Sequence, residues 1–231
     1  MKKSPVLFKV LCFLFRFKTI QVQAFVIGLL AVFSVSATIE ISEALLLKIQ
    51  NKYGKEAPLR VKQWQLLMQT AKGLSDQEKL KKVNDFFNYR IKFVDDLRLW
   101  NVADYWATPL EFLARGQGDC EDYSIAKYFT LKELGVSEKK MRITYVKALE
   151  LNQAHMVLTY YSSPRAVPLV LDNLIPEIKL ASKRTDLLPV YSFNGLGLWL
   201  AKTRGSGKRV GNADKLNLWT ELTQRMLNNT F

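Results

Sequence analysis

The sequence predicts an α+β fold, in which N-terminal helices pack against an antiparallel sheet formed by later strands. Helical periodicity and helix stop signals occupy the chain from about residue 40 to residue 135. Strand-like runs separated by turn signals follow at 142–149, 154–161 and 168–173. A block of helices followed by a block of strands is typical of the α+β class, whereas regular alternation would predict a parallel sheet.

Local signals place the first three helices. Residues 40–52 and 58–72 each have helical spacing, and a glycine follows each segment. The pattern Ser75-x-x-Glu78 is a capping box, in which two side chains satisfy the first backbone donors of a helix. It predicts that the third helix covers 76–90.

Cys120 begins the fourth predicted helix, 120–134, which Gly135 ends. The segment before it, 91–118, is expected to be a less regular connector that is rich in aromatic residues.

The C-terminal part is predicted to add strands, a loop and one helix. Further strands are expected within 187–200, and Lys202–Asn212 is expected to be a basic loop rich in Gly and Ser. An amphipathic pattern predicts a last helix, with its apolar positions at Leu216, Trp219, Leu222 and Met226.

The composition indicates a globular protein with a basic surface. Hydrophobic residues make up 48% of the 231 residues, enough for a core in one domain. The formal net charge of +13 favours an acidic partner without choosing among nucleic acid, anionic lipid and acidic protein. No aromatic-plus-basic pattern marks a nucleic-acid module, so we expect no nucleic-acid partner.

Residues 1–37 have the features of an export signal peptide. They hold five Lys or Arg and no acid, and an apolar run at Ala24–Phe33 precedes the small residues Ser34–Ala37. We expect cleavage after Ala37, which leaves a single domain over 38–231. An uncleaved membrane anchor is the alternative, although the apolar run is shorter than the roughly 20 residues of a spanning helix.

The two cysteines are Cys12 and Cys120, and signal cleavage would leave Cys120 alone. The mature chain would then form no internal disulfide. A lone thiol in an oxidising compartment is a liability unless it is buried or used. Because the whole chain has one histidine and the mature chain would keep one cysteine, a zinc site is nearly excluded.

Cys120 is a candidate nucleophile. It follows the turn residues Gly116 and Gly118 and stands at a predicted helix N-terminus. The helix dipole and free backbone N–H groups there favour a thiolate, and the same groups can stabilise an oxyanion. The alternative is a small buried core cysteine.

His155 and Asp172 are candidate partners of this thiol. If 154–161 and 168–173 pair as a hairpin, position 155 falls opposite roughly 172–174, and the carboxylate reaches the imidazole. That is the arrangement of base and orienting group that a cysteine nucleophile needs. The alternatives are a structural histidine and a strand-end aspartate that caps a turn.

Three carboxylates, Asp119, Glu121 and Asp122, surround the cysteine. Acids in a first helical turn stabilise the helix, which is one explanation for them. They also oppose thiolate formation, and a bound cation would remove that conflict. An all-oxygen cluster suits a hard ion such as Ca²⁺.

Several segments together resemble a known family. They are Trp106–Leu113, Gly116–Tyr123, Ala126–Tyr128, Ala154–Leu158, Val170–Leu174, and Pro189–Asn194 with Trp199-Leu200. Over residues 40–200, these motifs and their spacings resemble the bacterial transglutaminase-like cysteine proteinases, most closely the periplasmic proteases of the LapG type.

The resemblance implies a papain-like or transglutaminase-like fold, with the catalytic cysteine at a helix N-terminus. It implies that Cys120, His155 and Asp172 form the catalytic triad, and Trp106 is a candidate second donor to the oxyanion. Calcium is the implied cofactor, bound by Asp119, Glu121 and Asp122.

The resemblance also implies a biological role. The activity would be endoproteolysis of a large surface adhesin near its N-terminus, at a dialanine-type site, which releases cells from a biofilm. An inner-membrane receptor for cyclic di-GMP would sequester the protease in the periplasm. The alternatives are an acyl-transfer enzyme on the same triad, such as a transglutaminase, and a catalytically silent peptide-binding module.

Overall fold

The computed structural model of the protein describes residues 41–200 and 207–228. The chain divides into two compact units, Met1–Thr38 and Ile39–Phe231, and everything described belongs to the second. The predicted export signal, with Cys12, lies outside the described residues. None of the helices in the described part of the chain is long and apolar enough to cross a membrane.

The elements confirm the predicted α+β class. The helices are α1 (Glu43–Tyr53), α2 (Glu56–Ala71), α3 (Asp76–Arg90), α4 (Asp96–Leu99), α5 (Pro109–Arg115), α6 (Cys120–Glu133) and α7 (Asn217–Leu227). The strands are β1 (Lys92–Phe93), β2 (Gln117–Gly118), β3 (Met141–Ala148), β4 (Gln153–Tyr160), β5 (Leu169–Leu171), β6 (Lys179–Leu180), β7 (Leu187–Asn194), β8 (Gly197–Leu200) and β9 (Lys208–Gly211).

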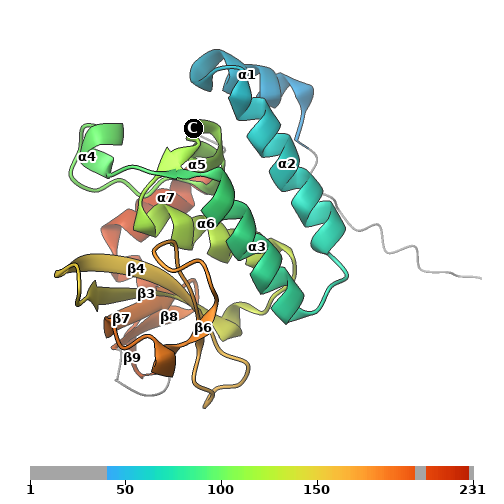
Figure 1. Ribbon diagram of the computed structural model, residues 1–231. Helices are drawn as coiled ribbons and strands as arrows, with labels where there is room; N and C mark the ends of the chain where they lie inside the picture. Colours follow the sequence, from blue (N-terminus) through green and yellow to red (C-terminus); the bar gives the residue numbers. More distant parts are fainter. Residues whose placement is uncertain (1–40, 201–206, 229–231) are drawn as a thin grey trace, which may run out of the picture. The chain divides into compact units, whose positions relative to one another are not determined.

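One antiparallel sheet holds most of the strands. Its order is β6-β5-β4-β3-β7-β8-β9, and every neighbouring pair runs antiparallel. Figure 1 shows the sheet in the lower half of the described part, with the helices α3 and α6 above it. The short strands β1 and β2 pair with each other in parallel, and this pair joins the end of α3 to the turn before α6.

The helix α6 connects the two halves of this architecture. It packs against β3 and β4 on one side and against α3 and α5 on others, while α2 covers α3 and α5 (Figure 1). Nine of its fourteen residues are buried. An apolar stripe on one face would serve a helix at the surface, whereas a helix with neighbours on most sides buries polar residues too.

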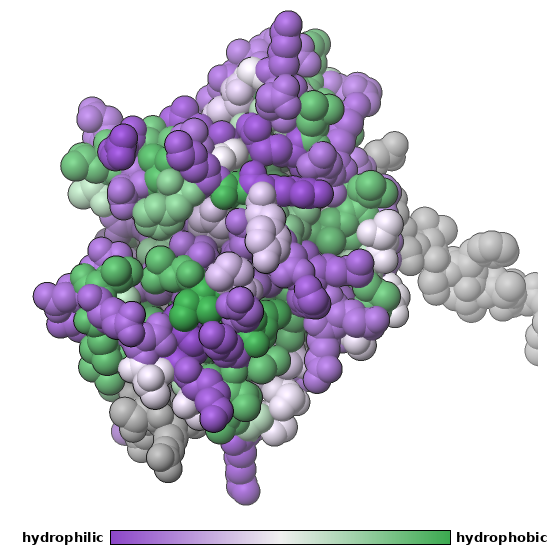
Figure 2. All heavy atoms as spheres, in the orientation of Figure 1, coloured by the Kyte–Doolittle hydropathy of each residue, from purple (hydrophilic) through white to green (hydrophobic). Residues whose placement is uncertain are grey.

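Apolar side chains on the helix-facing side of the sheet complete the core. Ile143, Leu158, Leu171 and Phe193 from four strands are fully buried there. Trp219 of α7 stacks on Phe129 of α6 with ring centroids 5.6 Å apart, which fastens the C-terminal helix to this core. On the face drawn in Figure 2, hydrophilic side chains alternate with apolar patches.

The connector 91–118 is more regular than the sequence analysis expects. It contains α4 and α5, and α5 begins with a complete capping box between Thr108 and Glu111, with Pro109 at its first turn. This helix was predictable, because Thr-Pro-x-Glu combines a capping box with proline at the position that tolerates it best. A seven-residue helix is too short to show a clear apolar period, so periodicity does not distinguish it from the irregular residues around it.

The prediction of a basic loop at Lys202–Asn212 is also partly wrong. Its residues Lys208–Gly211 form the edge strand β9, which pairs with β8. Pairing with a neighbouring strand supplies backbone hydrogen bonds that the local composition of Gly and Lys does not reveal.

Two glycines set the turn that leads into α6. Gly116 ends α5 in the left-handed conformation, with φ of +68°. The guanidinium of Arg60 lies where a Cβ at this position would project, and it donates to the carbonyls of Leu113 and Ala114 at 2.7 and 2.6 Å. A Cβ at Gly118 would collide with the Asp122 carboxylate and the Phe112 ring. The chain therefore needs glycine at both positions.

We predict that Gly116→Ala lowers the free energy of unfolding by more than about 1 kcal/mol, because it combines a strained φ with a clash against Arg60. The matched control is Gly73→Ala, at a glycine with no left-handed φ and no atom within 4 Å of the added Cβ. Urea unfolding of both variants measures the difference. Equal stability of the two variants would contradict this account of the turn.

Candidate active site

The hairpin of β4 and β5 joins His155 to Asp172. The strands pair in the register Leu158↔Leu171 and Thr159↔Val170. When this register is extended, positions 155 and 172 are diagonal neighbours on one face of the sheet. His155 Nε2 and Asp172 Oδ1 are 2.7 Å apart, and both side chains are almost fully buried. The contact is the one that the hairpin argument predicts.

Asp172 is held as a carboxylate. Burial opposes its charge, but the hydrogen bond and charge of His155, and then Arg184, lower the pKa of Asp172 to about 2. Arg184 Nη2 donates to Asp172 Oδ2 at 2.7 Å, and the backbone N–H of Leu174 donates to Oδ1 at 3.1 Å. An ionised carboxylate only accepts hydrogen bonds, so His155 Nε2 carries the proton that it donates to Asp172.

Two further side chains fix the backbone at Asp172. Asn88 Nδ2 of α3 and Lys127 Nζ of α6 donate to its carbonyl oxygen at 2.7 and 3.1 Å. Lys127 is 1% exposed, and burial lowers the pKa of its ammonium to about 7. The aspartate is thus positioned by two helices and by its own hairpin.

Cys120 stands at the first position of α6 and is partly buried. Its thiol donates to Glu121 Oε2 at 3.0 Å, and the helix that it begins packs against β4, the strand that carries His155. The structure therefore brings the cysteine to the strand that carries the histidine. Because Asp172 occupies Nε2, the ring nitrogen of His155 that remains for proton exchange with a thiol is Nδ1.

Burial, and then the negative charge of Glu121, raise the pKa of the Cys120 thiol well above its ordinary value. The helix N-terminus favours a thiolate, as the sequence predicts, but the neighbouring carboxylates outweigh it in this state. Burial and these negative charges both favour the protonated form of the thiol.

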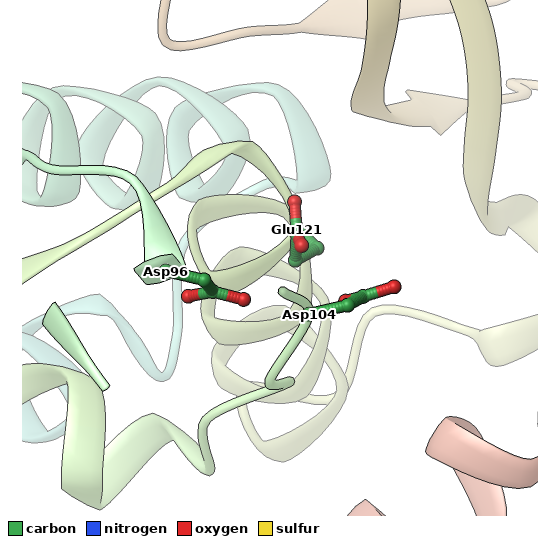
Figure 3. A group of neighbouring side chains, drawn as sticks. All are labelled: Asp96, Asp104 and Glu121. Carbon is green, nitrogen blue, oxygen red and sulfur yellow. The ribbon is translucent and has the colours of Figure 1, made fainter. Parts of the chain in front are cut away.

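The three acids around Cys120 lie close to two further acids from the connector. Asp119 and Asp122 group with Asp96, and Glu121 groups with Asp96 and Asp104; within each group one oxygen from each residue lies within 4.8 Å of the others. Figure 3 shows that Asp96 comes from the start of α4, Asp104 from the segment before α5, and Glu121 from the first turn of α6.

These carboxylates are unfavourable neighbours for one another. Burial raises the pKa of Asp96 to about 6, and burial with the charge of Asp119 raises that of Asp122 well above its usual range. Asp119 occupies the N-cap position of α6 but makes no side-chain capping bond, so helix capping does not explain it.

The cluster fits a hard divalent cation. Among the described residues, no hydrogen-bond donor meets one side-chain oxygen of Asp96, of Asp119 and of Asp122, although these atoms are buried. Buried carboxylate oxygens without a donor are costly, and a calcium ion takes oxygen ligands of this kind. The two groups of acids offer only carboxylate oxygens as ligand atoms, which argues against zinc.

Sequence reasoning missed Asp96, Asp104 and Arg184. The two aspartates stand in a connector that carries no strong local pattern, and only folding brings them to the start of α6. Arg184 follows a short 3₁₀ turn, Ala181–Lys183, in a segment with many basic residues, so nothing in its local sequence distinguishes it. Trp106 stacks on Phe193 at 5.5 Å, and its indole N–H meets no acceptor among the described residues.

Comparison with known proteins gives a consistent result. A family model described as bacterial transglutaminase-like cysteine proteinase (BTLCP) matches residues 52–188. This range includes Cys120, His155, Asp172 and the acidic cluster. Among curated protein sequences, no match was found.

Solved structures of Legionella pneumophila LapG are similar to this chain. The EGTA-treated form is 44% identical, covers 80% of this chain and 98% of its own, and superposes with a TM-score of 0.70. The calcium-bound form is also 44% identical, with 80% and 99% covered and a TM-score of 0.68.

We predict that Asp172 makes stability depend on pH below about 4. A pKa of about 2 in the folded state, against 3.8 ordinarily, gives stabilisation that is present above 3.8 and is lost as pH falls through 2. The loss amounts to about 2 kcal/mol of unfolding free energy.

Urea unfolding between pH 4 and pH 2 should show this loss in the wild type and a smaller one in Asp172→Asn. Asp214→Asn removes an exposed aspartate and should keep the wild-type profile. If Asp172→Asn and the wild type lose stability in parallel over this range, Asp172 is not the responsible group.

Proposed function

Because the chain belongs to the bacterial transglutaminase-like cysteine proteinase family, we propose that it is a calcium-dependent endopeptidase that uses Cys120, His155 and Asp172. The observation that carries the proposal is the buried 2.7 Å contact of His155 Nε2 with Asp172, on a strand that packs against the helix whose first residue is Cys120. A nucleophile, a base and an orienting carboxylate are the minimal set for covalent acyl transfer.

Each residue of the triad then has one task. Asp172 keeps the His155 ring with its proton on Nε2, so that Nδ1 accepts the proton of the Cys120 thiol. The thiolate attacks the scissile carbonyl, and backbone N–H groups at the start of α6 stabilise the oxyanion. His155 then protonates the leaving amine, and water hydrolyses the thioester.

We propose that Asp119, Glu121 and Asp122 hold the calcium ion, with Asp96 and Asp104 as further candidate ligands. Bound calcium would offset the carboxylate charge that opposes ionisation of the thiol. Support comes from the buried carboxylate oxygens that meet no donor within residues 41–200 and 207–228, and from the relative that is described as calcium-bound.

We further propose that the protein is exported to the periplasm and cleaves a large surface adhesin near its N-terminus, at a dialanine-type site. Cleavage would release the adhesin and promote biofilm dispersal. A periplasmic domain of an inner-membrane cyclic di-GMP receptor would control access to the protease. The motif resemblance supports this role, and the basic net charge suits an acidic substrate or receptor surface.

Cleavage of an N-terminal adhesin fragment tests the activity. We expect the wild-type chain to produce two fragments, and Cys120→Ala to produce none while its circular dichroism spectrum stays unchanged, because only the nucleophile is removed. His155→Ala should likewise produce no fragments, because the base is removed. Cleavage by Cys120→Ala at the wild-type rate would sink the mechanism.

Product masses in the same reactions decide between hydrolysis and acyl transfer. Hydrolysis adds one water across the broken bond, whereas a transglutaminase reaction joins an added amine to the acyl product. A folded protein whose thiol reacts with a labelling reagent, but which yields neither product, would indicate a peptide-binding module.

Calcium binding is tested by titration calorimetry on the full chain. We expect Asp96→Asn to raise the Kd for calcium by roughly tenfold or more, because affinity follows the number of charged ligands. The matched control is Asp95→Asn, which removes the neighbouring exposed carboxylate. Equal affinities in the two variants would exclude Asp96 as a ligand.

A further inference from the structure

Arg184 contacts the catalytic hairpin from a part of the chain that the triad does not include. It follows the 3₁₀ turn Ala181–Lys183 and is 3% exposed. Its Nη2 donates to Asp172 Oδ2 at 2.7 Å and to Asp186 Oδ2 at 2.7 Å, and its Nε donates to Asp186 Oδ1 at 2.9 Å. The guanidinium therefore lies between two carboxylates, one of them in the triad.

The two oxygens of Asp172 have separate tasks as a result. Oδ1 faces His155 Nε2 and the backbone of Leu174, while Oδ2 faces Arg184. Rotation of the carboxylate would break two charge-assisted hydrogen bonds at once, and such bonds are about twice as strong as neutral ones. Arg184 thus restricts which oxygen meets the histidine.

Stability alone is a weak reason for this ion pair. Replacing a buried ion pair by apolar residues is often neutral or stabilising, since both charges lose their hydration. Arg184 Nη1 also has no acceptor among the described residues, which adds a cost to burying the side chain.

We propose that Arg184 is a positioning residue of the catalytic site, which keeps Asp172 ionised and oriented so that His155 carries its proton on Nε2. Arginine suits this task because it stays charged at any working pH. A neutral Asp172 could itself donate to Nε2, and the proton of the ring would then move to Nδ1, the nitrogen that must accept from the thiol. The inference rests on the proposed triad.

Two other charged side chains lie near Asp172 without contacting its carboxylate. Lys127 of α6 donates to the Asp172 carbonyl rather than to its carboxylate, and Asp186 contacts Arg184 instead of His155. Among the Lys and Arg side chains that the structure describes, Arg184 is therefore the one that forms an ion pair with the Asp172 carboxylate.

The single histidine of the chain makes a direct test available. In the full chain without a histidine tag, labelled with ¹⁵N-histidine, a two-bond ¹H–¹⁵N correlation spectrum reports the tautomer of His155 without ambiguity. We expect the Nε2-protonated form in the wild type and a mixture of the two tautomers in Arg184→Gln. Lys183→Gln removes an exposed charge one residue away and should give the wild-type spectrum.

Kinetics on the adhesin fragment provide the second readout. We expect Arg184→Gln to lower kcat by roughly 10- to 100-fold, as for other residues that orient a catalytic side chain, with KM nearly unchanged. On an Asp172→Asn background, Arg184→Gln should cause no further loss of kcat, because its effect passes through that carboxylate.

A wild-type tautomer in folded Arg184→Gln would overturn the proposal, and so would an additive loss of kcat in the double variant. If Arg184→Gln does not fold, Arg184→Lys takes its place, since lysine keeps the charge but cannot fork between two carboxylates. The tautomer is read without substrate, so a failure of the proposed protease activity leaves this test intact.

Discussion

Helix α6 packs against the sheet, α3 and α5 at once, and its partners must therefore satisfy the polar groups that it buries. Asp122 accepts from the backbone of Ala107 at 2.8 Å, Lys127 donates to the carbonyl of Asp172 at 3.1 Å, and Thr130 accepts from the indole of Trp64 at 2.8 Å. Each bond ties a different segment to the helix. Because an unsatisfied buried polar group costs free energy, these bonds fix the orientation of the helix, which begins at Cys120 and packs against β4.

The charges at the two ends of the site are compensated in different ways. On the β4–β5 hairpin, the protein supplies its own cation, and Arg184 with His155 keeps Asp172 ionised. At the start of α6, several carboxylates converge, and Glu121 accepts a hydrogen bond from the Cys120 thiol. In the described part of the chain, an arginine compensates the charge at the hairpin, whereas buried carboxylate oxygens at the start of α6 meet no donor. The second arrangement suits an external cation.

Local patterns predicted the elements that have strong signals of their own. The capping box at Ser75 fixes the start of α3 at Asp76, as expected, and α6 begins at Cys120. Strand period and turn position alone predict that His155 lies beside Asp172, and the two side chains are in contact. Two short elements were not predicted. The helix α5 is too short to show a clear helical period, and β9 forms because it pairs with β8.

The sequence by itself determined the fold class, the segments that carry Cys120, His155 and Asp172, and the family to which those segments point. Periodicity, caps and motif spacing are local properties, and they survive without knowledge of the tertiary contacts. Only the tertiary structure decided that Asp96, Asp104 and Arg184 join the site. Their places depend on how distant segments pack, and a charged side chain in an irregular segment looks the same whether it meets solvent or a buried partner.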